Sequence, residues 1–287
     1  MTQSELNKVR TIASLVVIIF LTLTGYVAFF ANDRSAEIYF FDIGQGDSSL
    51  IVLPNDIQIL IDGGPNMAIL EKVSKAIPVY DRTIEYIILS HPHSDHLSGI
   101  VEVLKRYDVG LLIHNGVTRD NLNLYNDFEE IINKKNIKTH IVKEKMEIKF
   151  NETSYMEFYY PDASKEFGRG DINASSIVNR LTFGGVRVLF TGDIPRDVER
   201  YLIEKGEGIE ADILKVAHQG SRTSSEEDFI IGVSPIFSVI MVGADNQYGH
   251  PHQKVLKTLE RFGGEVLRTD IEGDILFKTD GDIIIRE

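Results

Sequence analysis

The 287-residue sequence contains no cysteine, and this absence excludes disulfide bonds, thiolate nucleophiles and cysteine-ligated zinc. It also lacks an excess of positive charge, because 30 Lys and Arg residues stand against 43 Asp and Glu residues, for a formal net charge of −13. Such a charge repels polyanions at long range, so a nucleic-acid substrate would require a local basic patch or bound cations. Since an exported protein without disulfides is viable, the missing cysteine does not locate the protein.

Apolar and charged residues are both present in ordinary amounts, at 43% and 25% of the chain. This balance is typical of a globular protein that buries a sizeable core, so disorder is not expected. The length allows one large domain or two small ones.

Long hydrophobic runs are absent except in one segment, residues 12–30, where nineteen residues carry no charge. As a helix that rises about 1.5 Å per residue, this segment would reach roughly 28 Å, close to the thickness of a bilayer core. We therefore predict a transmembrane signal-anchor helix at 12–30, after a short cytoplasmic tail at 1–11 and before a linker at 31–36 and one large domain at 37–287.

Charges beside the apolar segment set its expected orientation. Lys8 and Arg10 precede it, whereas Asp33 and Arg34 follow it. Under the positive-inside tendency the helix crosses the cytoplasmic membrane once and leaves the large domain outside the cytoplasm. A cleaved signal peptide is a weaker interpretation because the run exceeds a usual signal core, and a buried core helix is weaker because the run ends cleanly near the terminus.

Beyond residue 36, short β-branched and aromatic runs alternate with Gly, Asp and Asn turns, and helical periodicities lie between them. We expect strands at 37–41, 49–53, 57–61, 83–89, 109–113, 137–142, 146–150, 154–160, 175–183, 186–191, 212–216, 237–242 and 265–268. We expect helices at 68–77, 98–107, 122–135, 195–204, 225–231 and 251–262. Two successive halves that each contain a sheet and helices predict two sheets packed face to face with helices outside.

The run His91-Pro-His-Ser-Asp-His96 is the strongest chemical signal, because three of the eight histidines of the chain fall within six positions. We expect it in a turn at the end of a strand, with a helix that follows from residue 98. Imidazole and carboxylate are the ligands that Zn²⁺ or Mn²⁺ prefers when no thiolate is available. The run predicts a divalent metal site with room for two ions, and the alternative is an exposed histidine-rich turn without a ligand role.

Five further motifs accompany this run along the chain: Phe41–Ser48, Leu60–Gly64, Phe190–Asp193, Leu214–Ser221 and Tyr248–His252. Together with the histidine run they resemble the metallo-β-lactamase-like hydrolases, and among these the hydrolase domain of ComEC-type competence DNA-uptake proteins. The resemblance covers residues 36–285. It implies an α/β fold, the αβ/βα sandwich, in which two mixed sheets pack face to face with helices outside and metals at one edge between the sheets.

The resemblance also implies a cofactor, two divalent metal ions that are either Zn²⁺ or Mn²⁺. The implied ligands are His91 and His93 for the first ion, Asp95, His96 and His218 for the second, and Asp193 as the carboxylate that bridges both. A carboxylate can bridge because its two oxygens offer several lone pairs.

One stretch departs from the wider superfamily, in which many members supply a third histidine to the first ion. This sequence has Asp171-Ile-Asn-Ala-Ser-Ser176 there, as the ComEC-type group tends to have Asn and Ser. The full ligand set of the first ion is therefore undetermined. This ion would bind more weakly, or the site would prefer Mn²⁺ to Zn²⁺. Asn173 and Ser175 become candidates for substrate contact.

Acidic residues before the histidine run are further candidates. The resemblance implies that Asp62 accepts a hydrogen bond from a ligating histidine and fixes its tautomer, against the alternative of an ordinary turn residue. The glycine-rich Asp42–Asp47 segment lacks the Lys-Ser/Thr ending of a phosphate loop and leads into a strand, so no nucleotide cofactor is expected. Its glycines let Gln45 and Asp47 approach the site, with Asp42 beside them.

His250 precedes an expected helix, and the resemblance implies that it contacts the substrate or the transition state; a helix-capping loop is the alternative. Ser221 and His252 are further candidates near the site, and His252 is balanced between function and structure. Asp95, Asn173 and His250 are the expected catalytic residues.

Two bound cations would lower the pKa of a bridging water to give hydroxide, clamp the substrate oxyanion and stabilise the leaving oxygen, which serves phosphodiester, lactone, thioester and amide hydrolysis alike. The motif set favours a membrane-anchored phosphodiesterase, a nuclease that acts on DNA through this metal-activated hydroxide beside a membrane channel partner. The alternatives are hydrolysis of another extracytoplasmic ester, such as a choline-phosphate or a lactone, and a non-catalytic binding module of the same fold.

A basic surface strip beside the metal site would distinguish DNA from a small ester, because the net charge disfavours DNA. The candidates for such a strip are Lys165, Arg169, Arg180, Arg187, Lys215 and Arg222. Their clustering depends on the fold.

Overall fold

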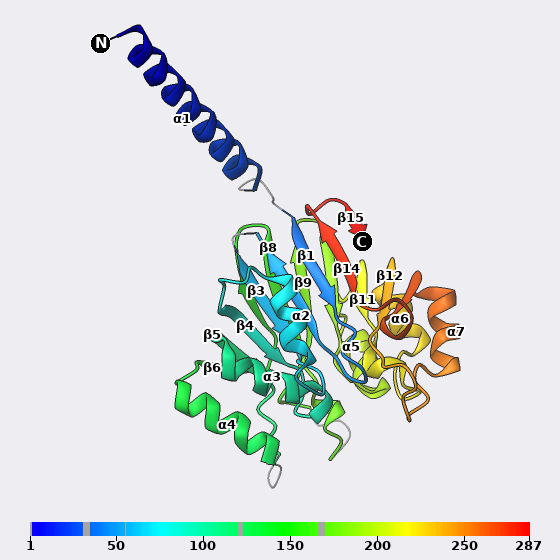
Figure 1. Ribbon diagram of the computed structural model, residues 1–287. Helices are drawn as coiled ribbons and strands as arrows, with labels where there is room; N and C mark the ends of the chain where they lie inside the picture. Colours follow the sequence, from blue (N-terminus) through cyan, green and yellow to red (C-terminus); the bar gives the residue numbers. More distant parts are fainter. Residues whose placement is uncertain (1, 31–34, 55, 120–122, 166–169) are drawn as a thin grey trace. The chain divides into compact units, whose positions relative to one another are not determined.

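The computed structural model describes residues 2–30, 35–54, 56–119, 123–165 and 170–287. The chain divides into two compact units, residues 1–35 and residues 36–287. The first unit contains one helix, α1 (Gln3–Phe30), which is dark blue in Figure 1. Its segment Gln3–Gly25 is long and apolar enough to cross a membrane.

Helix α1 begins well before the apolar segment, so most of the expected tail is helical. The backbone N–H of Thr2 donates to the Glu5 carboxylate (2.7 Å), and the N–H of Glu5 donates to the Thr2 hydroxyl (3.3 Å). This reciprocal pair is a capping box, which satisfies two of the N–H groups that a helix start leaves free. Residues 31–34 of the expected linker lie outside the described residues.

The second unit contains two mixed β-sheets (Figure 1). The strands of the first sheet are β1 (Ala36–Phe40), β2 (Ser49–Leu53), β3 (Ile57–Ile61), β4 (Thr83–Leu89), β5 (Asp108–His114), β6 (Thr139–Ile141), β14 (Ile275–Thr279) and β15 (Ile284–Arg286). Those of the second sheet are β7 (Met146–Lys149), β8 (Ser154–Tyr160), β9 (Val178–Phe183), β10 (Val186–Phe190), β11 (Ile213–Lys215), β12 (Phe237–Ile240) and β13 (Glu265–Arg268). The strand orders are β15-β14-β1-β2-β3-β4-β5-β6 and β13-β12-β11-β10-β9-β8-β7.

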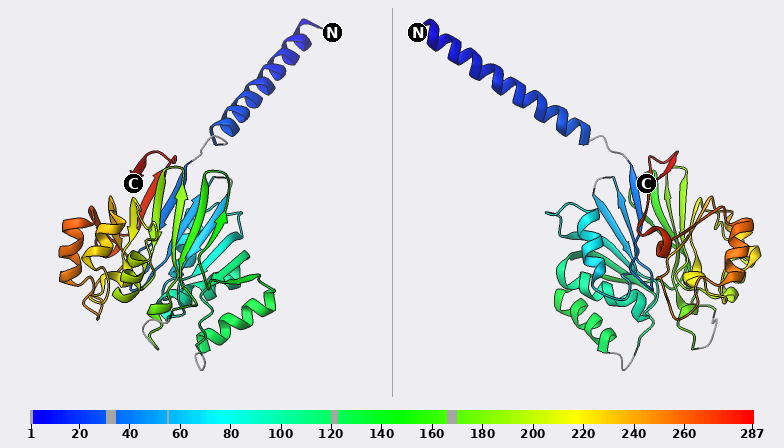
Figure 2. Two further views of the ribbon diagram at one scale, coloured as in Figure 1. Left: turned by 180° about the vertical axis from the view of Figure 1, so that it is seen from behind. Right: turned by 45° about the vertical axis from the view of Figure 1, so that its right-hand side comes forward.

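Helices cover the outer faces of both sheets (Figure 2). Those beside the first sheet are α2 (Ala68–Ala76), α3 (Ser94–Arg106) and α4 (Asn123–Lys135), and those beside the second are α5 (Arg196–Glu204), α6 (Glu227–Val233) and α7 (Gln253–Phe262), followed by the short α8 (Thr269–Glu272). Single 3₁₀ turns are formed by Asn173–Ser175 and Ala217–Gly220.

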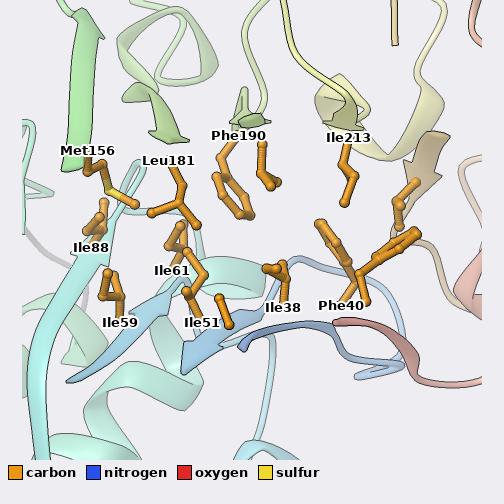
Figure 3. Close-up of a cluster of buried hydrophobic side chains, with 14 of the residues drawn as sticks. Ile38, Phe40, Ile51, Ile59, Ile61, Ile88, Met156, Leu181, Phe190 and Ile213 are labelled. Carbon is orange, nitrogen blue, oxygen red and sulfur yellow. The ribbon is translucent and has the colours of Figure 1, made fainter. Parts of the chain in front are cut away.

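A core of apolar side chains fills the space between the two sheets (Figure 3). Alternate residues of β1 are buried, since successive side chains of a strand point to opposite faces. The close-up shows Ile38, Phe40, Ile51, Ile59, Ile61 and Ile88 from the first sheet opposite Met156, Leu181, Phe190 and Ile213 from the second. Each such side chain contributes about 1.5–3 kcal/mol by leaving water.

Two further cores lie between each sheet and its helices. Ile69 and Leu97, from α2 and α3, pack with Leu60 of β3 on the first sheet. Val198 of α5 and Phe229 of α6 pack on the second sheet. The predicted architecture, two mixed sheets packed face to face with helices outside, is confirmed.

The sheets do not correspond to two successive halves of the chain. The C-terminal strands β14 and β15, which the sequence did not lead us to expect, return to the first sheet, and β14 pairs antiparallel with β1 through Phe277 opposite Ile38. Residues 275–279 alternate between buried and half-buried positions, but no local signal reveals a partner at the other end of the domain. Long-range pairing is therefore the reason that these strands were missed.

Helix α3 begins at Ser94, four residues before the expected start, so the histidine run is not confined to a turn. Asp95 lies in the first turn of the helix, where a carboxylate interacts favourably with the partial positive charge of the helix start. The strand expected from residue 175 starts later, at Val178, because the preceding residues form a 3₁₀ turn.

Parallel strands bring the candidate residues to one edge of the sandwich. Strands β3 and β4 are parallel neighbours in the first sheet, and β10, β11 and β12 are parallel in the second. Asp62 and His91 follow β3 and β4, whereas Asp193 and His218 follow β10 and β11. The carboxyl ends of these strands therefore define the site.

Candidate metal centre

The histidine run lies where β4 ends and α3 begins. His91 and His96 are fully buried, His93 is the N-cap residue of α3, and Asp95 and His96 lie in the first helical turn. The backbone N–H groups of His96 and Leu97 donate to the His93 carbonyl (3.1 and 2.9 Å). A strand-to-helix junction therefore orients the run.

The Oδ2 atom of Asp193 lies at the centre of the cluster. It is 3.4 Å from His96 Nε2, 3.9 Å from His91 Nε2 and 3.7 Å from His218 Nε2. His91, His96 and Asp193 offer ligand atoms that all lie within 4.8 Å of one another. One buried carboxylate oxygen thus faces three imidazole nitrogens that come from both sheets.

The ring nitrogens are suited to metal coordination. His96 Nε2 is buried without a hydrogen-bond partner among the described residues, which is uncommon for a buried polar atom. His91 Nε2 and His93 Nδ1 lie 3.0 Å apart and can face one cation, and Asp95 Oδ2 lies 3.7 Å from His96 Nε2. Imidazole and carboxylate donors match divalent ions such as Zn²⁺ and Mn²⁺, so these residues fit the expected metals.

Asp62 lies behind the histidines. Its Oδ2 accepts hydrogen bonds from His96 Nδ1 (2.8 Å) and from the Ser90 hydroxyl (2.6 Å), and its Oδ1 accepts the Ser90 backbone N–H (2.8 Å). A bond at Nδ1 leaves Nε2 of His96 directed at Asp193. This placement is consistent with the orienting role expected for Asp62.

The buried ionisable groups perturb one another. Burial opposes the charged form of His96, but the carboxylates of Asp193 and Asp62 hold its pKa well above the usual value. Burial and the neighbouring His96 hold the pKa of His91 well below the usual value. Burial would raise the pKa of Asp193, but the histidines, foremost His96, lower it well below the usual range. The two neighbouring carboxylates therefore favour the protonated form of His96, whereas burial disfavours that of His91.

Lys215, a candidate for the surface strip, is instead buried at the metal centre. Its Nζ forms an ion pair with Asp47 Oδ2, lies 3.8 Å from Asp193 Oδ1 and donates to the Gly192 carbonyl (2.8 Å). Burial opposes the charge of Lys215, but the carboxylates of Asp47 and Asp193 raise its pKa above the usual value. The ammonium faces Oδ1 of Asp193 and leaves Oδ2 to the histidines.

Gln45 reaches the site through a second amide. Gln45 Nε2 donates to Gln219 Oε1 (2.5 Å), and Gln219 Nε2 donates to Asp95 Oδ2 (3.2 Å). His218 and Gln219 both adopt left-handed backbone conformations, with φ of 50° and 52°, which non-glycine residues rarely occupy unless neighbouring contacts hold them. Gln219 was not anticipated, because only the fold brings it beside Asp95.

The segment after β1 approaches α3 closely at Gly46. A Cβ atom at Gly46 would lie 2.2 Å from the Asp95 carbonyl oxygen, so no larger residue fits. Asp42 lies farther back, where its carboxylate accepts the N–H of Gly44 (3.3 Å) and its own N–H donates to Asp274 (2.7 Å). The structure thus brings Gln45 and Asp47 to the site and leaves Asp42 to shape the loop.

Ser176 faces the metal centre where Ser175 was expected. Ser176 Oγ lies 3.2 Å from His91 Nδ1 and accepts the backbone N–H of Asp193 (3.1 Å). Ser175 instead accepts a hydrogen bond from Asn115 Nδ2 (2.9 Å) and lines a separate cavity of about 410 Å³. The 3₁₀ turn at residues 173–175 decides which serine points inward.

Ser221 and His252 lie behind the ligands. Ser221 Oγ is 3.0 Å from Thr223 Oγ1, which is 3.3 Å from His218 Nδ1. His252 is the N-cap residue of α7 and accepts the N–H of Lys254 through Nδ1 (3.5 Å). The structure favours the capping role for His252.

The metal centre opens into a cleft of about 400 Å³. The expected residues that line it are His93, Asp95, Asn173, Asp193, His218 and His250. Asn173 Oδ1 and His250 Nδ1 are buried without hydrogen-bond partners among the described residues. Both catalytic candidates therefore offer unsatisfied polar atoms beside the candidate metal ligands.

None of the six candidates for a basic strip lines this cleft within the described part of the chain. Lys215 is buried, the guanidinium of Arg180 binds backbone carbonyls, Lys165 lines the separate cavity, and Arg169 lies outside the described residues. Arg119 is the one Lys or Arg side chain among the described residues that lines the cleft. The sequence offered no motif that could have indicated it.

Comparison with known proteins identifies relatives of this domain. Residues 41–158 match the family model described as the metallo-beta-lactamase superfamily. The chain is 31% identical over 265 residues to ComE operon protein 3 of Bacillus subtilis, across 84% of this chain and 33% of that protein. It is 28% identical over 262 residues to competence protein ComA of Neisseria gonorrhoeae, across 90% and 35%. The chain thus spans about a third of the length of these curated relatives.

A solved structure agrees with the fold. Igni18, a metallo hydrolase from Ignicoccus hospitalis, superposes with a TM-score of 0.53 at 14% identity, across 85% of this chain and 98% of that chain. At this identity the similarity concerns the fold alone, and it confirms the expected sandwich.

Proposed function

Because residues 41–158 match the metallo-beta-lactamase superfamily and the chain is similar to two competence proteins, we propose that this chain is a metal-dependent phosphodiesterase that hydrolyses DNA. The main support is the position of Asp193 Oδ2, which faces the buried histidines of both sheets. The similarity to competence proteins favours DNA over other phosphodiesters.

Divalent cations in this centre would polarise the scissile phosphate and acidify a water molecule. The residues that would hold them are His91, His93, Asp95, His96, Asp193 and His218. Asp62 orients His96, and Lys215 holds the Oδ1 side of Asp193. These two contacts keep the ligand atoms aimed at the cleft before substrate arrives.

Asn173 and His250 complete the proposed catalytic set. Burial lowers the pKa of His250, so its ring is neutral near pH 7 and can donate one hydrogen bond to an oxygen of the phosphate. Asn173 presents its amide to the same cleft. Together they would bind the charge that develops on the reacting phosphate.

Helix α1 supports a membrane-bound setting. We propose that it anchors the domain on the outer side of the cytoplasmic membrane and that a channel partner receives the DNA. Helix α1 is the one candidate membrane span among the described residues.

The second candidate function is hydrolysis of a small extracytoplasmic ester. The net charge of −13 and the absence of the six basic candidates from the described lining of the cleft favour it. Metal-dependent hydrolysis of a small ester such as bis-p-nitrophenyl phosphate, without cleavage of DNA, would select this alternative.

The test uses the purified full chain in detergent with added Mn²⁺ or Zn²⁺. Bound metal is measured by elemental analysis, and hydrolysis is measured on single-stranded DNA, duplex DNA and bis-p-nitrophenyl phosphate. We expect His96→Ala to lose bound metal and DNA cleavage, whereas His140→Ala, an exposed histidine on β6, keeps both. If the unmodified chain neither binds metal nor hydrolyses any of these substrates, the non-catalytic binding module is the remaining function.

A further inference from the structure

Tyr248 is an exposed aromatic residue that lies two ring contacts from the metal ligands. Its side chain is 63% exposed. Its ring stacks on His250 at 5.8 Å and 28°, and His250 meets His218 edge to face at 5.6 Å and 78°. A row of three rings therefore leads from the mouth of the cleft to a candidate metal ligand.

Asn246 holds this row in place. Its side-chain Nδ2 donates to the carbonyls of Gly243 (3.0 Å) and His250 (2.7 Å), and its Oδ1 accepts the backbone N–H groups of Tyr248 (3.2 Å) and His250 (3.0 Å). One amide thus ties both ends of the loop that carries the exposed ring. The ring is positioned in advance, which reduces the entropy lost when a ligand binds.

Arg119 contributes a positive charge to the same cleft. It lies in the connection between β5 and α4, on the side of the first sheet, whereas Tyr248 lies in the connection after β12, on the side of the second. No carboxylate of the described residues forms an ion pair with Arg119.

We infer that Tyr248 and Arg119 form a subsite for one unpaired nucleotide of the substrate strand, with its base on the tyrosine ring and a backbone phosphate on the guanidinium. The inference rests on the proposed function, because the candidate metal ligands that line the same cleft would act on the strand that the two residues hold. Every base has a flat face that stacks on an aromatic side chain, and Arg binds phosphate through two parallel N–H groups.

The subsite selects a strand by its pairing state. A base within a duplex is already stacked and paired, so its face becomes available to Tyr248 only after it leaves the helix. A single strand or a frayed end meets this requirement without that cost. The domain therefore binds the ends of strands and single strands in preference to the interior of a duplex.

Equilibrium binding tests the base contact. The probe is a fluorescent, phosphorothioate-linked thymidine oligonucleotide, which resists hydrolysis, and the protein is the Mn²⁺-loaded full chain in detergent. We expect Tyr248→Ala to weaken binding about 5- to 150-fold, the range for loss of one stacked base, and Tyr248→Phe to leave it unchanged. Tyr80→Ala removes a tyrosine that is 85% exposed before β4 and is the matched control without effect.

An abasic strand separates stacking from a structural role. Tyr248→Ala should not weaken binding of an abasic phosphorothioate strand, because that strand has no base to stack. Equal weakening for both strands, no weakening for either, or equal affinity of the unmodified chain for a relaxed circular duplex, which has no ends, would overturn the subsite.

Salt dependence tests the phosphate contact. Each phosphate neutralised on a single strand contributes about 0.7 to the slope of log affinity against log salt concentration. Arg119→Gln should lower the slope by about that amount, and Arg119→Lys, which keeps the charge, should leave the slope as it is in the unmodified chain. An unchanged slope in Arg119→Gln would contradict the assignment. If the oligonucleotide binds through Tyr248 and nothing is hydrolysed, the proposed function fails while the subsite stands. If DNA is hydrolysed but oligonucleotide binding does not depend on Tyr248, the proposed function stands while the subsite fails.

Discussion

The two sides of the candidate metal centre are built differently. On the side of the first sheet, the ligands fall within one strand-to-helix junction, and hydrogen bonds from Ser90 and His96 to Asp62 hold it. On the side of the second sheet, Asp193 and His218 come from separate turns, and buried charges such as Lys215 support them. The ligands of the first side are close in the sequence, whereas those of the second side come from separate turns, and Asp193 among them faces the buried ammonium of Lys215.

The largest expected effect is at the buried ion pair that joins Lys215 of the second side to Asp47 of the first. Lys215→Met leaves the carboxylate of Asp47 buried without its cation, which should destabilise the domain by about 3–5 kcal/mol. Chemical denaturation of the metal-free protein measures the loss. The double variant with Asp47→Asn should be markedly more stable than Lys215→Met alone, and simple addition of the two effects would show that the pair is not coupled.

Glu199 of α5 provides a test of pH dependence on the second side. Its buried carboxylate accepts the backbone N–H groups of Ser225 (2.6 Å) and Glu226 (3.0 Å), yet burial raises its pKa from 4.5 to about 7. The folded state binds this proton more tightly than the unfolded state does. The stability it contributes is therefore present below pH 4.5 and is lost as the pH rises to 7, by about 3 kcal/mol.

Glu199→Gln should remove this part of the pH dependence of unfolding. Glu204→Gln, on the same helix, is the matched control, and its unfolding curves should follow those of the unmodified protein. Identical pH profiles for Glu199→Gln and the unmodified protein would exclude the assigned cause.

Asp62→Asn tests the hydrogen-bonded first side. Loss of the carboxylate that orients His96 should lower metal affinity about 10- to 100-fold, as is usual for partners of ligating histidines. Competition with a chelating dye measures the affinity. Asp42→Asn, in the loop before Gly44, should leave it unchanged, and equal losses in both variants would mean that Asp62 has no special role.

The smallest expected effect is at His252, outside both sets of ligands. His252→Ala removes a side-chain cap from α7 and should cost about 1 kcal/mol or less in thermal denaturation. Metal affinity and oligonucleotide binding should not change. A large loss of metal affinity or of oligonucleotide binding would show that His252 belongs to the functional site.

Sequence reasoning could name candidate ligands because the side chains suited to metal coordination are concentrated in short motifs. The histidine run, Asp193 and His218 could all be named before the fold was known, and the structure brings them together around one carboxylate oxygen. The choice between Ser175 and Ser176 was not accessible in this way, since it depends on a single 3₁₀ turn. Such a turn changes which neighbour faces the site without any change in composition.

The sequence alone determined that histidine and carboxylate side chains suited to a divalent metal occur in one short run and that the chain has one long apolar helix, because both follow from side-chain type and local spacing. Only the tertiary structure decided that Lys215 is buried between Asp47 and Asp193, that β14 returns to the first sheet, and that Arg119 and Tyr248 share a cleft. Strand pairing and burial join residues far apart in the chain, and their energies depend on neighbours that no local pattern specifies.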